Sequence, residues 1–262
     1  MFSLEGVTAL VTGAGSPAGI GFATARLLGK GGANVALAST TLRIRERAQE
    51  LRHAGVVATG HVADLTDTAA RQVLVDEVLR QHGHVDVLVN NAGMSQLGSP
   101  EVMGDFASLS DKDWSAALDR NLFTAVGLTR ALLPAMVKRG FGRVINVASV
   151  SGPLVANPRT APYAAAKAAM LGLTRALALE TARHGVTVNA VAPGWIATAS
   201  SSDAELAAGT NTPAGRPGTP NEVAAIIGFL ASRESSYVTG QLLVVDGGNT
   251  IQEFKGPPEE WY

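Results

Sequence analysis

Short, nearly continuous apolar runs recur along this chain, and they constrain its fold more than any other feature. Each run is five to seven residues long and rich in valine, leucine and alanine. Continuous apolarity over so few residues is typical of strands buried on both faces of a parallel sheet. Such runs occupy residues 7–11, 34–38, 56–62, 85–89, 143–147, 187–191 and 241–245, with 56–62 the weakest.

Segments with apolar residues at helical spacing lie between these runs. They cover residues 19–30, 44–54, 69–82, 111–139, 161–184 and 221–231. Asp67 and Asn221 stand where helix N-caps are expected. The alternation predicts an α/β fold with one domain over residues 1–262. We expect a doubly wound Rossmann-type sheet of about seven parallel strands, with right-handed crossovers and helices on both faces.

Composition excludes several classes of protein. Hydrophobic residues make up 46% of the chain and charged residues 16%, which provides for a large core. Lysine and arginine number 21 against 22 acidic residues, so the basic excess of a nucleic-acid binder is missing. The absence of cysteine excludes disulfides and thiol catalysis. Without a leader or an apolar run of ~20 residues, we expect a cytoplasmic protein with no membrane partner.

Two segments interrupt the alternation. Residues 198–218 are small, polar and glycine-rich. They are either a disordered insertion or, as we expect, a mobile lid over a site. The tail at residues 252–262 carries two adjacent prolines and several aromatic residues. It is either a frayed end or an arm that packs on a neighbouring subunit.

A glycine-rich loop follows the first apolar run and opens the first helical segment. Gly13 permits a tight turn, Gly19 lets a pyrophosphate approach the backbone, and Gly21 allows close packing of helix on sheet. The free N–H groups and positive dipole of the helix N-terminus then face the phosphates. A glycine-rich turn without a ligand is the alternative, but the position at the first strand–helix junction favours a dinucleotide site.

Further motifs follow in a fixed order. They are TGAGSPAGIG at 12–21, NNAG at 90–93, Asn121, Ser149, Tyr163 with Lys167, Pro193-Gly194 and Asp246-Gly247-Gly248. On these motifs the whole chain resembles the classical short-chain dehydrogenase/reductase family, and within it the 3-oxoacyl reductases and carbonyl reductases. The resemblance implies an oxidoreductase that moves a hydride between a nicotinamide cofactor and a secondary alcohol or ketone. It also implies a homotetramer.

The chain departs from the family pattern in two places. Five residues separate Gly13 from Gly19, whereas the family usually has three. The longer spacing resembles that of the divergent enoyl reductases. Those proteins have tyrosine and lysine seven residues apart, whereas here the spacing is four, which favours the classical branch. Tyr163 follows Ser149 by fourteen residues, which implies a one-residue insertion in the substrate loop.

Four residues are the predicted catalytic set. Tyr163 and Lys167 lie one helical turn apart, on one face. We expect the ammonium, together with an oxidised nicotinamide, to lower the pKa of the phenol so that it exchanges a proton near neutral pH. By resemblance Ser149 hydrogen-bonds the substrate carbonyl; the family pattern Ser-x-x-Gly selects it over Ser151. By resemblance Asn121 positions a relay water through a local helix distortion.

The resemblance assigns cofactor contacts along the ends of the strands. They are Gly13, Gly15, Ser16, Gly19, Ile20, Ser39, Thr40, Arg43, Asp64, Leu65, Asn91, Ala92, Gly93, Tyr163, Lys167, Pro193, Gly194, Ile196 and Thr198. Asp64 corresponds to the aspartate that contacts adenine.

The end of the second apolar run determines the choice of cofactor. A carboxylate there bonds the ribose hydroxyls and repels a 2′-phosphate. Ser39 occupies this position, and no acidic residue occurs between Asn34 and Arg45. Arg43 offers a charge-assisted contact to phosphate. Against this, Ala18 stands where many NADP-dependent relatives carry a basic residue. The absence of a repelling carboxylate is the firmer argument, so we favour NADP(H) and leave NAD(H) open.

Substrate contacts are expected at the far end of the site. The candidates are Met94, Ser95, Gln96, Leu154, Val155, Trp195 and residues 198–218. Their apolar character favours a fairly hydrophobic ketone or 3-oxoacyl compound as the small-molecule substrate. An NAD-dependent dehydrogenase of polyols, sugars or hydroxysteroids is the alternative enzyme. A dinucleotide-binding scaffold without activity is the alternative of another class.

Three further features receive structural interpretations. The pattern of His82, His84 and Asp86 resembles a set of metal ligands, but it is better interpreted as the solvated end of a helix, so no metal is expected. The basic run 43–47 is interpreted as a mostly solvated helix face, with Arg43 the exception. Small residues along the helix at 161–184 allow close helix–helix approach, in keeping with the homotetramer.

Overall fold

The computed structural model describes residues 3–93 and 101–256. Its centre is one parallel sheet in the order β3-β2-β1-β4-β5-β6-β7. The strands are β1 (Thr8–Thr12), β2 (Asn34–Ser39), β3 (Ala58–Val62), β4 (Val87–Asn90), β5 (Gly142–Val147), β6 (Val186–Pro193) and β7 (Leu242–Val245). The predicted doubly wound sheet with helices on both faces is confirmed, and every predicted strand is present within about two residues of its expected bounds.

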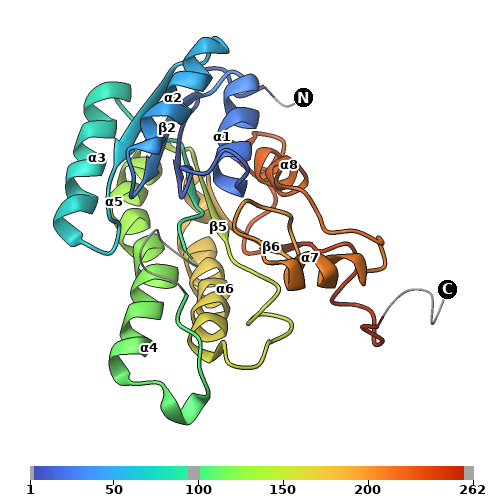
Figure 1. Cartoon of the computed structure of the whole chain (residues 1–262). Helices are drawn as coiled ribbons and strands as arrows, with labels where there is room; N and C mark the ends of the chain where they lie inside the picture. The colour runs from blue at the N-terminus through green and yellow to red at the C-terminus, as the bar shows by residue number, and fades with distance from the viewer. Residues whose placement is uncertain (1–2, 94–100, 257–262) are drawn as a thin grey trace.

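Helices cover both faces of this sheet (Figure 1). They are α1 (Ile20–Lys30), α2 (Arg43–His53), α3 (Thr68–His82), α4 (Asp111–Leu118), α5 (Thr124–Arg139), α6 (Ala161–Thr181), α7 (Asp203–Thr210) and α8 (Pro220–Ala231). Short 3₁₀ turns lie at Phe106–Ser108 and Ala182–His184. Helices α1, α2 and α8 pack on one face, and α3, α5 and α6 pack on the other.

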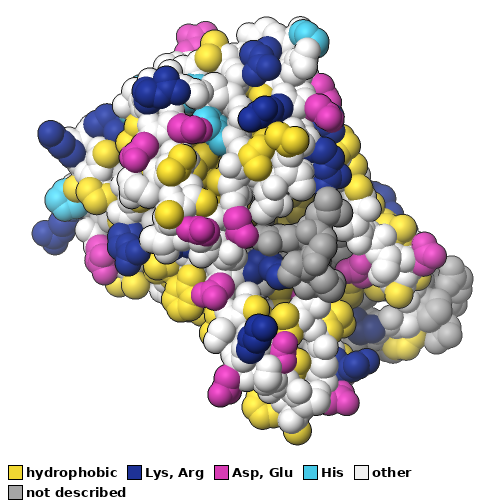
Figure 2. All heavy atoms as spheres, turned by 60° about the vertical axis from the view of Figure 1, so that its left-hand side comes forward, with side chains coloured by type: hydrophobic (Ala, Val, Ile, Leu, Met, Phe, Trp, Pro, Cys, Tyr) yellow, Lys and Arg dark blue, Asp and Glu magenta, His cyan; other side chains and the backbone are white. Residues whose placement is uncertain are grey.

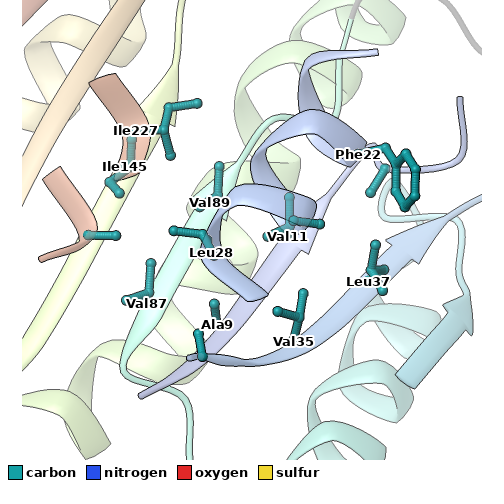
Figure 3. Packing of buried hydrophobic residues seen from close by; sticks show 14 of the residues in the cluster. Ala9, Val11, Phe22, Leu28, Val35, Leu37, Val87, Val89, Ile145 and Ile227 are labelled. Carbon is teal, nitrogen blue, oxygen red and sulfur yellow. The ribbon is translucent and has the colours of Figure 1, made fainter. Parts of the chain in front are cut away.

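The two buried faces explain why the strands read as continuous apolar runs. Val11, Val89 and Ile145 lie in the core on the face that α1 and α8 cover, and Ile227 of α8 packs in the same cluster (Figure 3). Leu10, one position away, belongs to the core on the opposite face. Because successive side chains alternate between faces, a strand covered on both sides needs an apolar residue at every position.

The helices show one local distortion, and one N-cap differs from the expectation. The helix predicted over 111–139 contains a π-helical turn at Asp119–Phe123, between α4 and α5. Thr219, not Asn221, caps α8: its side chain accepts a hydrogen bond from the backbone of Glu222. Asn221 instead accepts a 3.0 Å hydrogen bond from Arg26. Pro220 at the first helical position explains the shift, because proline is favoured there.

The segment 198–218 contains an unpredicted helix, α7. Ser202 and Glu205 form a capping box: the serine side chain accepts from the Glu205 backbone, and the glutamate side chain accepts from the Ser202 backbone. The segment is therefore a loop that contains a helix, which the sequence analysis did not predict. The Ser-x-x-Glu spacing was the available signal.

Charged surfaces are mixed. On the face that Figure 2 displays, basic and acidic side chains are interspersed among apolar ones. Among the described residues, no helix is long and apolar enough to cross a membrane.

Arg47 corrects the interpretation of the basic run 43–47. Its side chain is buried, with 9% of the residue exposed, and the guanidinium lies 5.6 Å from the centre of the Phe22 ring. It also pairs with Glu50 at 2.5 Å. A planar, weakly hydrated cation that stacks on an aromatic ring tolerates such burial.

The histidines near the end of α3 form hydrogen bonds within the fold. His82 Nε2 lies 2.8 Å from Thr59 Oγ1, which lies 2.9 Å from His61 Nε2. His84 Nε2 lies 2.9 Å from a carboxylate oxygen of Asp86. His82 and His84 are half-buried, so the interpretation of this helix end as solvated is only partly correct. Within residues 3–93 and 101–256, no cluster of three metal-ligating side chains forms.

Candidate active site

A cavity of about 740 Å³ opens at the carboxyl ends of the central strands. Its walls come from the loops after β1, β2, β4, β5 and β6, and from α6 and α7. β1 and β4 are neighbours in the sheet, with β2 and β5 on their outer sides, so the chain reverses its winding direction at this point. Such a switch point is where doubly wound sheets bind ligands.

The glycine loop forms one end of the cavity, and its shape fits a dinucleotide. Gly13 has φ of +66°, which favours glycine. A Cβ on Gly21 would lie 2.6 Å from the Gly13 carbonyl oxygen, and one on Gly15 would lie 2.8 Å from Ser39 Oγ. No side chain caps the N-terminus of α1, and its first turn has no acidic residue. The backbone N–H groups of this turn are thus suited to phosphate.

Thr12 holds the loop against the end of β4. Its hydroxyl donates to the Val89 carbonyl at 3.1 Å and accepts from the backbone N–H groups of Asn91 at 2.9 Å and Ala92 at 3.0 Å. Asn91 Nδ2 donates to the carbonyls of Thr12 and Gly13 at 2.9 and 3.2 Å. The Asn91 amide therefore fixes the glycine loop, and Asn91, Ala92 and Gly93 border the cavity beside it.

The loop after β2 lines the same end of the cavity. Ser39, Thr40, Thr41 and Arg43 contribute to its wall. Ser39 Oγ donates to the Thr41 carbonyl at 3.2 Å, and Arg43 Nε donates to Thr41 Oγ1 at 3.4 Å. This arrangement presents hydroxyls and one guanidinium, without a carboxylate, at the position that contacts the adenosine ribose in this fold.

Of the two predicted cofactor contacts after β3, Asp64 and Leu65, only Leu65 borders the cavity. Asp64 Oδ1 accepts from the Thr66 backbone at 2.9 Å and from the Thr66 hydroxyl at 2.7 Å. The structure thus gives Asp64 a role in the turn before α3.

Lys167 lines the cavity and is 3% exposed. Its Nζ donates to the Val147 carbonyl at 2.9 Å and lies 5.6 Å from the centre of the Tyr163 ring. Burial lowers the pKa of this ammonium to about 8, against a smaller opposing effect of Glu101. The lysine is therefore easier to deprotonate than a solvated one.

Burial raises the pKa of the Tyr163 phenol to about 12, and a hydrogen bond with Ser149 opposes the rise. The carboxylates of Glu101 and Glu205 add to the rise. Burial therefore outweighs this hydrogen bond in the protein alone, and the lowering of the pKa expected beside an oxidised nicotinamide stays a prediction.

Ser149 stands at the end of β5 beside Tyr163 and lines the cavity. Its Oγ accepts a 3.1 Å hydrogen bond from the Ser151 backbone, which orients the hydroxyl. Ser151 is not part of the cavity wall. The geometry therefore supports the choice of Ser149.

Asn121 lies inside the π-helical turn and is 2% exposed. Its Nδ2 donates to the Ala117 carbonyl at 3.1 Å. A Cβ on Gly93 would lie 2.9 Å from Asn121 Oδ1 and 3.4 Å from Lys167 Nζ, so the three residues converge. The π turn is the helix distortion that the resemblance implied, and π turns often occur at functional sites.

The cavity wall contains both predicted residues and residues that the sequence analysis did not name. Pro193, Gly194, Ile196 and Thr198, predicted as cofactor contacts, line it, and so does Trp195, predicted as a substrate contact. Ala199, Ser200, Ser201 and Glu205, from the predicted segment 198–218, also line the cavity. The lining residues that the sequence analysis did not name include Ala63, Arg120, Thr124, Val147 and Ala148. The position next to Asn121 was the available signal for Arg120.

Some predicted substrate contacts lie elsewhere. Leu154 and Val155 are absent from the cavity wall; Leu154 is 49% exposed, and Val155 forms a β-bridge with Ser151. The position of these two residues therefore does not support the prediction that they contact substrate. Met94, Ser95 and Gln96 fall outside the described residues.

Comparisons with known proteins agree with this geometry. Residues 13–250 match a family model described as enoyl-(acyl carrier protein) reductase. Oxidoreductase UcpA of Escherichia coli (strain K12) is 39% identical, covering 97% of this chain and 98% of that protein. The 3-oxoacyl-[acyl-carrier-protein] reductase FabG of Vibrio cholerae is 39% identical, covering 94% of this chain and 98% of that protein.

A solved structure shows the same architecture. A variant actinorhodin polyketide ketoreductase, determined with NADPH, is 37% identical, with a TM-score of 0.86, covering 96% of this chain and all of that one. The chain belongs to the short-chain dehydrogenase/reductase family, and it is an oxidoreductase of the kind that acts on CH–OH and keto groups.

Proposed function

We propose that the protein is a carbonyl reductase that uses NADP(H) to reduce a fairly hydrophobic ketone or 3-oxoacyl compound. One observation carries the proposal: Ser149, Tyr163 and Lys167 meet in one cavity whose other end is a glycine cradle for a dinucleotide. The nicotinamide, when bound, supplies the hydride. The protein's residues then bind and orient the carbonyl and provide its proton.

The ionisation of the site fits the reducing direction. Ser149 Oγ donates a hydrogen bond to the carbonyl oxygen and holds it beside Tyr163. The neutral phenol of Tyr163, whose pKa is about 12, donates its proton to that oxygen as the carbonyl carbon gains the hydride. Lys167, with a pKa of about 8, is placed near the phenol to return a proton. Asn121 adjoins Lys167 and serves the relay of that proton.

Three observations support the preference for NADP(H). No carboxylate stands at the end of β2, where Ser39 lies. Arg43 lines the adjacent wall of the cavity. The structural neighbour among polyketide ketoreductases was determined with NADPH. Ala18 in the glycine loop contributes no charge, so the preference depends mainly on the absence of repulsion.

The substrate proposal depends on the cavity wall and on the relatives. Trp195 presents a large apolar surface directly after Pro193-Gly194. The relative FabG is named for the reduction of 3-oxoacyl groups on acyl carrier protein. We assign residues 198–218, with α7, the role of a lid over this end.

A turnover screen tests this function. The purified protein is assayed with ketones, 3-oxo thioesters and polyols, each with both nicotinamide cofactors, by the change in nicotinamide absorbance. We expect the fastest turnover with NADPH and a 3-oxo thioester or apolar ketone. Turnover confined to polyols with NAD⁺ would contradict the proposed substrate and cofactor, and an absence of turnover in all arms would contradict enzymatic reduction.

We also propose that the protein assembles as a homotetramer. Small residues line much of α6, which allows a second helix to approach closely. Leu179 on α6 and Val244 on β7 are exposed apolar residues near the end of the sheet. Light scattering is expected to give about four times the chain mass of 26.9 kDa. A mass of one chain at micromolar concentration would refute the assembly.

A further inference from the structure

One acidic side chain from the lid lines the substrate end of the cavity. Glu205 lies in the first turn of α7 and contributes to the wall along with Tyr163 and Trp195. Its Oε2 accepts from the Ser202 backbone at 2.7 Å and from the Ser202 hydroxyl at 3.0 Å. The capping box therefore holds the carboxylate in a fixed place, rather than leaving it on a freely rotating side chain.

Glu205 and Glu101 bring two carboxylates near the reacting residues. Arg120 and Lys167 are the other charged residues at this part of the wall, and both are buried. Both act on Glu101, whose pKa is raised first by burial and then by Glu205, and they oppose that rise. Within the described part of the chain, Glu205 makes no salt bridge with a basic side chain.

The field of Glu205 reaches the reacting group. After burial, the carboxylates of Glu101 and, to a smaller extent, Glu205 raise the pKa of Tyr163. A negative charge that disfavours a phenolate at this position also disfavours any other anion there. The repulsion is stronger in a partly buried cavity than in water, because the effective dielectric constant is lower.

We propose that Glu205 is a specificity-determining residue that restricts the enzyme to carbonyl substrates without a negative charge beside the reacting carbonyl. This inference rests on the proposed function. Simple ketones are accepted, and so are 3-oxo compounds whose acid group is masked as an ester or thioester. Free oxo acids and sugar acids that carry a keto group are rejected. The lid thus selects by charge at one end of the cavity, while Trp195 selects by apolar surface.

A matched pair of substrates tests the charge of Glu205 directly. The pair is 3-oxobutanoate, which is an anion, and its uncharged methyl ester. Both are assayed with NADPH on wild type, Glu205→Gln and the control Asp203→Asn. Glutamine keeps the capping box, since its side-chain oxygen also accepts from the Ser202 backbone. Asp203 lies in the same turn of α7, is exposed and does not line the cavity, so its variant removes an equal charge elsewhere.

The expected result is a change in the ester-to-acid ratio of kcat/KM. Wild type prefers the ester by at least about tenfold, the size of one charge repulsion of about 1.4 kcal/mol. Glu205→Gln lowers this ratio at least about threefold, through faster use of the acid. Asp203→Asn leaves it within about twofold.

Two results overturn the inference, and they differ from failure of the proposed function. The first is a wild type that uses acid and ester equally well. The second is a ratio that Glu205→Gln leaves unchanged or alters no more than Asp203→Asn does. Absence of any carbonyl reduction, by contrast, removes the proposed function and with it the basis of this inference.

Discussion

Replacing Lys167 by methionine is expected to stabilise the fold while it removes activity. The ammonium is 3% exposed, and burial lowers its pKa from 10.5 to about 8. A tenfold change in proton affinity corresponds to about 1.4 kcal/mol, so keeping this group charged at pH 7 costs the native state about 3 kcal/mol. Methionine also loses the 2.9 Å hydrogen bond to Val147, worth about 1 kcal/mol. The net expected gain is about 2 kcal/mol.

The pH dependence of the stability difference shows whether the charge of Lys167 is its cause. The folded-state pKa of Lys167 lies below its unfolded value. Between these values the unfolded chain binds a proton that the native chain does not, so the stability of the wild type rises with pH through this window. The advantage of Lys167→Met is fully present below about pH 8 and is lost as pH approaches 10.5. It decreases by about 1 kcal/mol between pH 7 and pH 9.

Denaturant unfolding at pH 7 and pH 9 measures both quantities, at one fixed protein concentration because assembly contributes to apparent stability. Tyr163→Phe is the matched control. Its phenol is neutral in both states below about pH 9, so its removal leaves the pH dependence unchanged. A Lys167→Met variant that is less stable than wild type at pH 7, or an advantage that does not change with pH, would refute the reasoning.

Three other outcomes follow from the structure. Ser39→Asp reverses cofactor preference, from at least about tenfold in favour of NADPH to a preference for NADH in kcat/KM, by repulsion of the 2′-phosphate. If wild type prefers NADH, or if Arg43→Ala leaves NADPH use untouched, the phosphate contact is wrong. Gly21→Ala weakens NADPH binding at least about tenfold by titration calorimetry, because its Cβ would lie 2.6 Å from a loop carbonyl; unchanged affinity would contradict the glycine cradle. Burial lowers the pKa of His82 below 6.5, so the stability that its neutral form contributes decreases as pH falls below 6.5. His82→Gln should therefore make the free energy of unfolding depend less on pH between about pH 6.5 and 5. An unaltered pH dependence in the variant would count against this.

Much of the fold was predictable because each strand is covered on both faces. Continuous apolar runs and intervening helical periods report burial directly, so the sheet and its helices could be derived from the sequence. Helix α7 was missed because its residues are small and polar and give no apolar stripe; only its capping box identifies it. Arg47 was missed for a related reason, since stacking on Phe22 buries a residue type that is usually exposed.

The site was predictable as a set of motifs but not as an electrostatic environment. Spacing places Tyr163 and Lys167 on one helical face, yet it contains no measure of burial, and burial determines the direction of both pKa shifts. Arg120 and Glu205 reach the cavity from a π turn and from the lid. Their contribution depends on contacts between distant segments, which no local pattern contains.

Proton donation by Tyr163 is the central claim, and one comparison tests it most directly. Carbonyl-dependent oxidation of NADPH is followed for wild type and Tyr163→Phe, with NADPH affinity measured for both proteins. The account predicts that the variant binds NADPH within about twofold of wild type but loses at least about a hundredfold in kcat/KM, as removal of a general acid does. Activity within about threefold of wild type, with binding intact, would contradict the assignment.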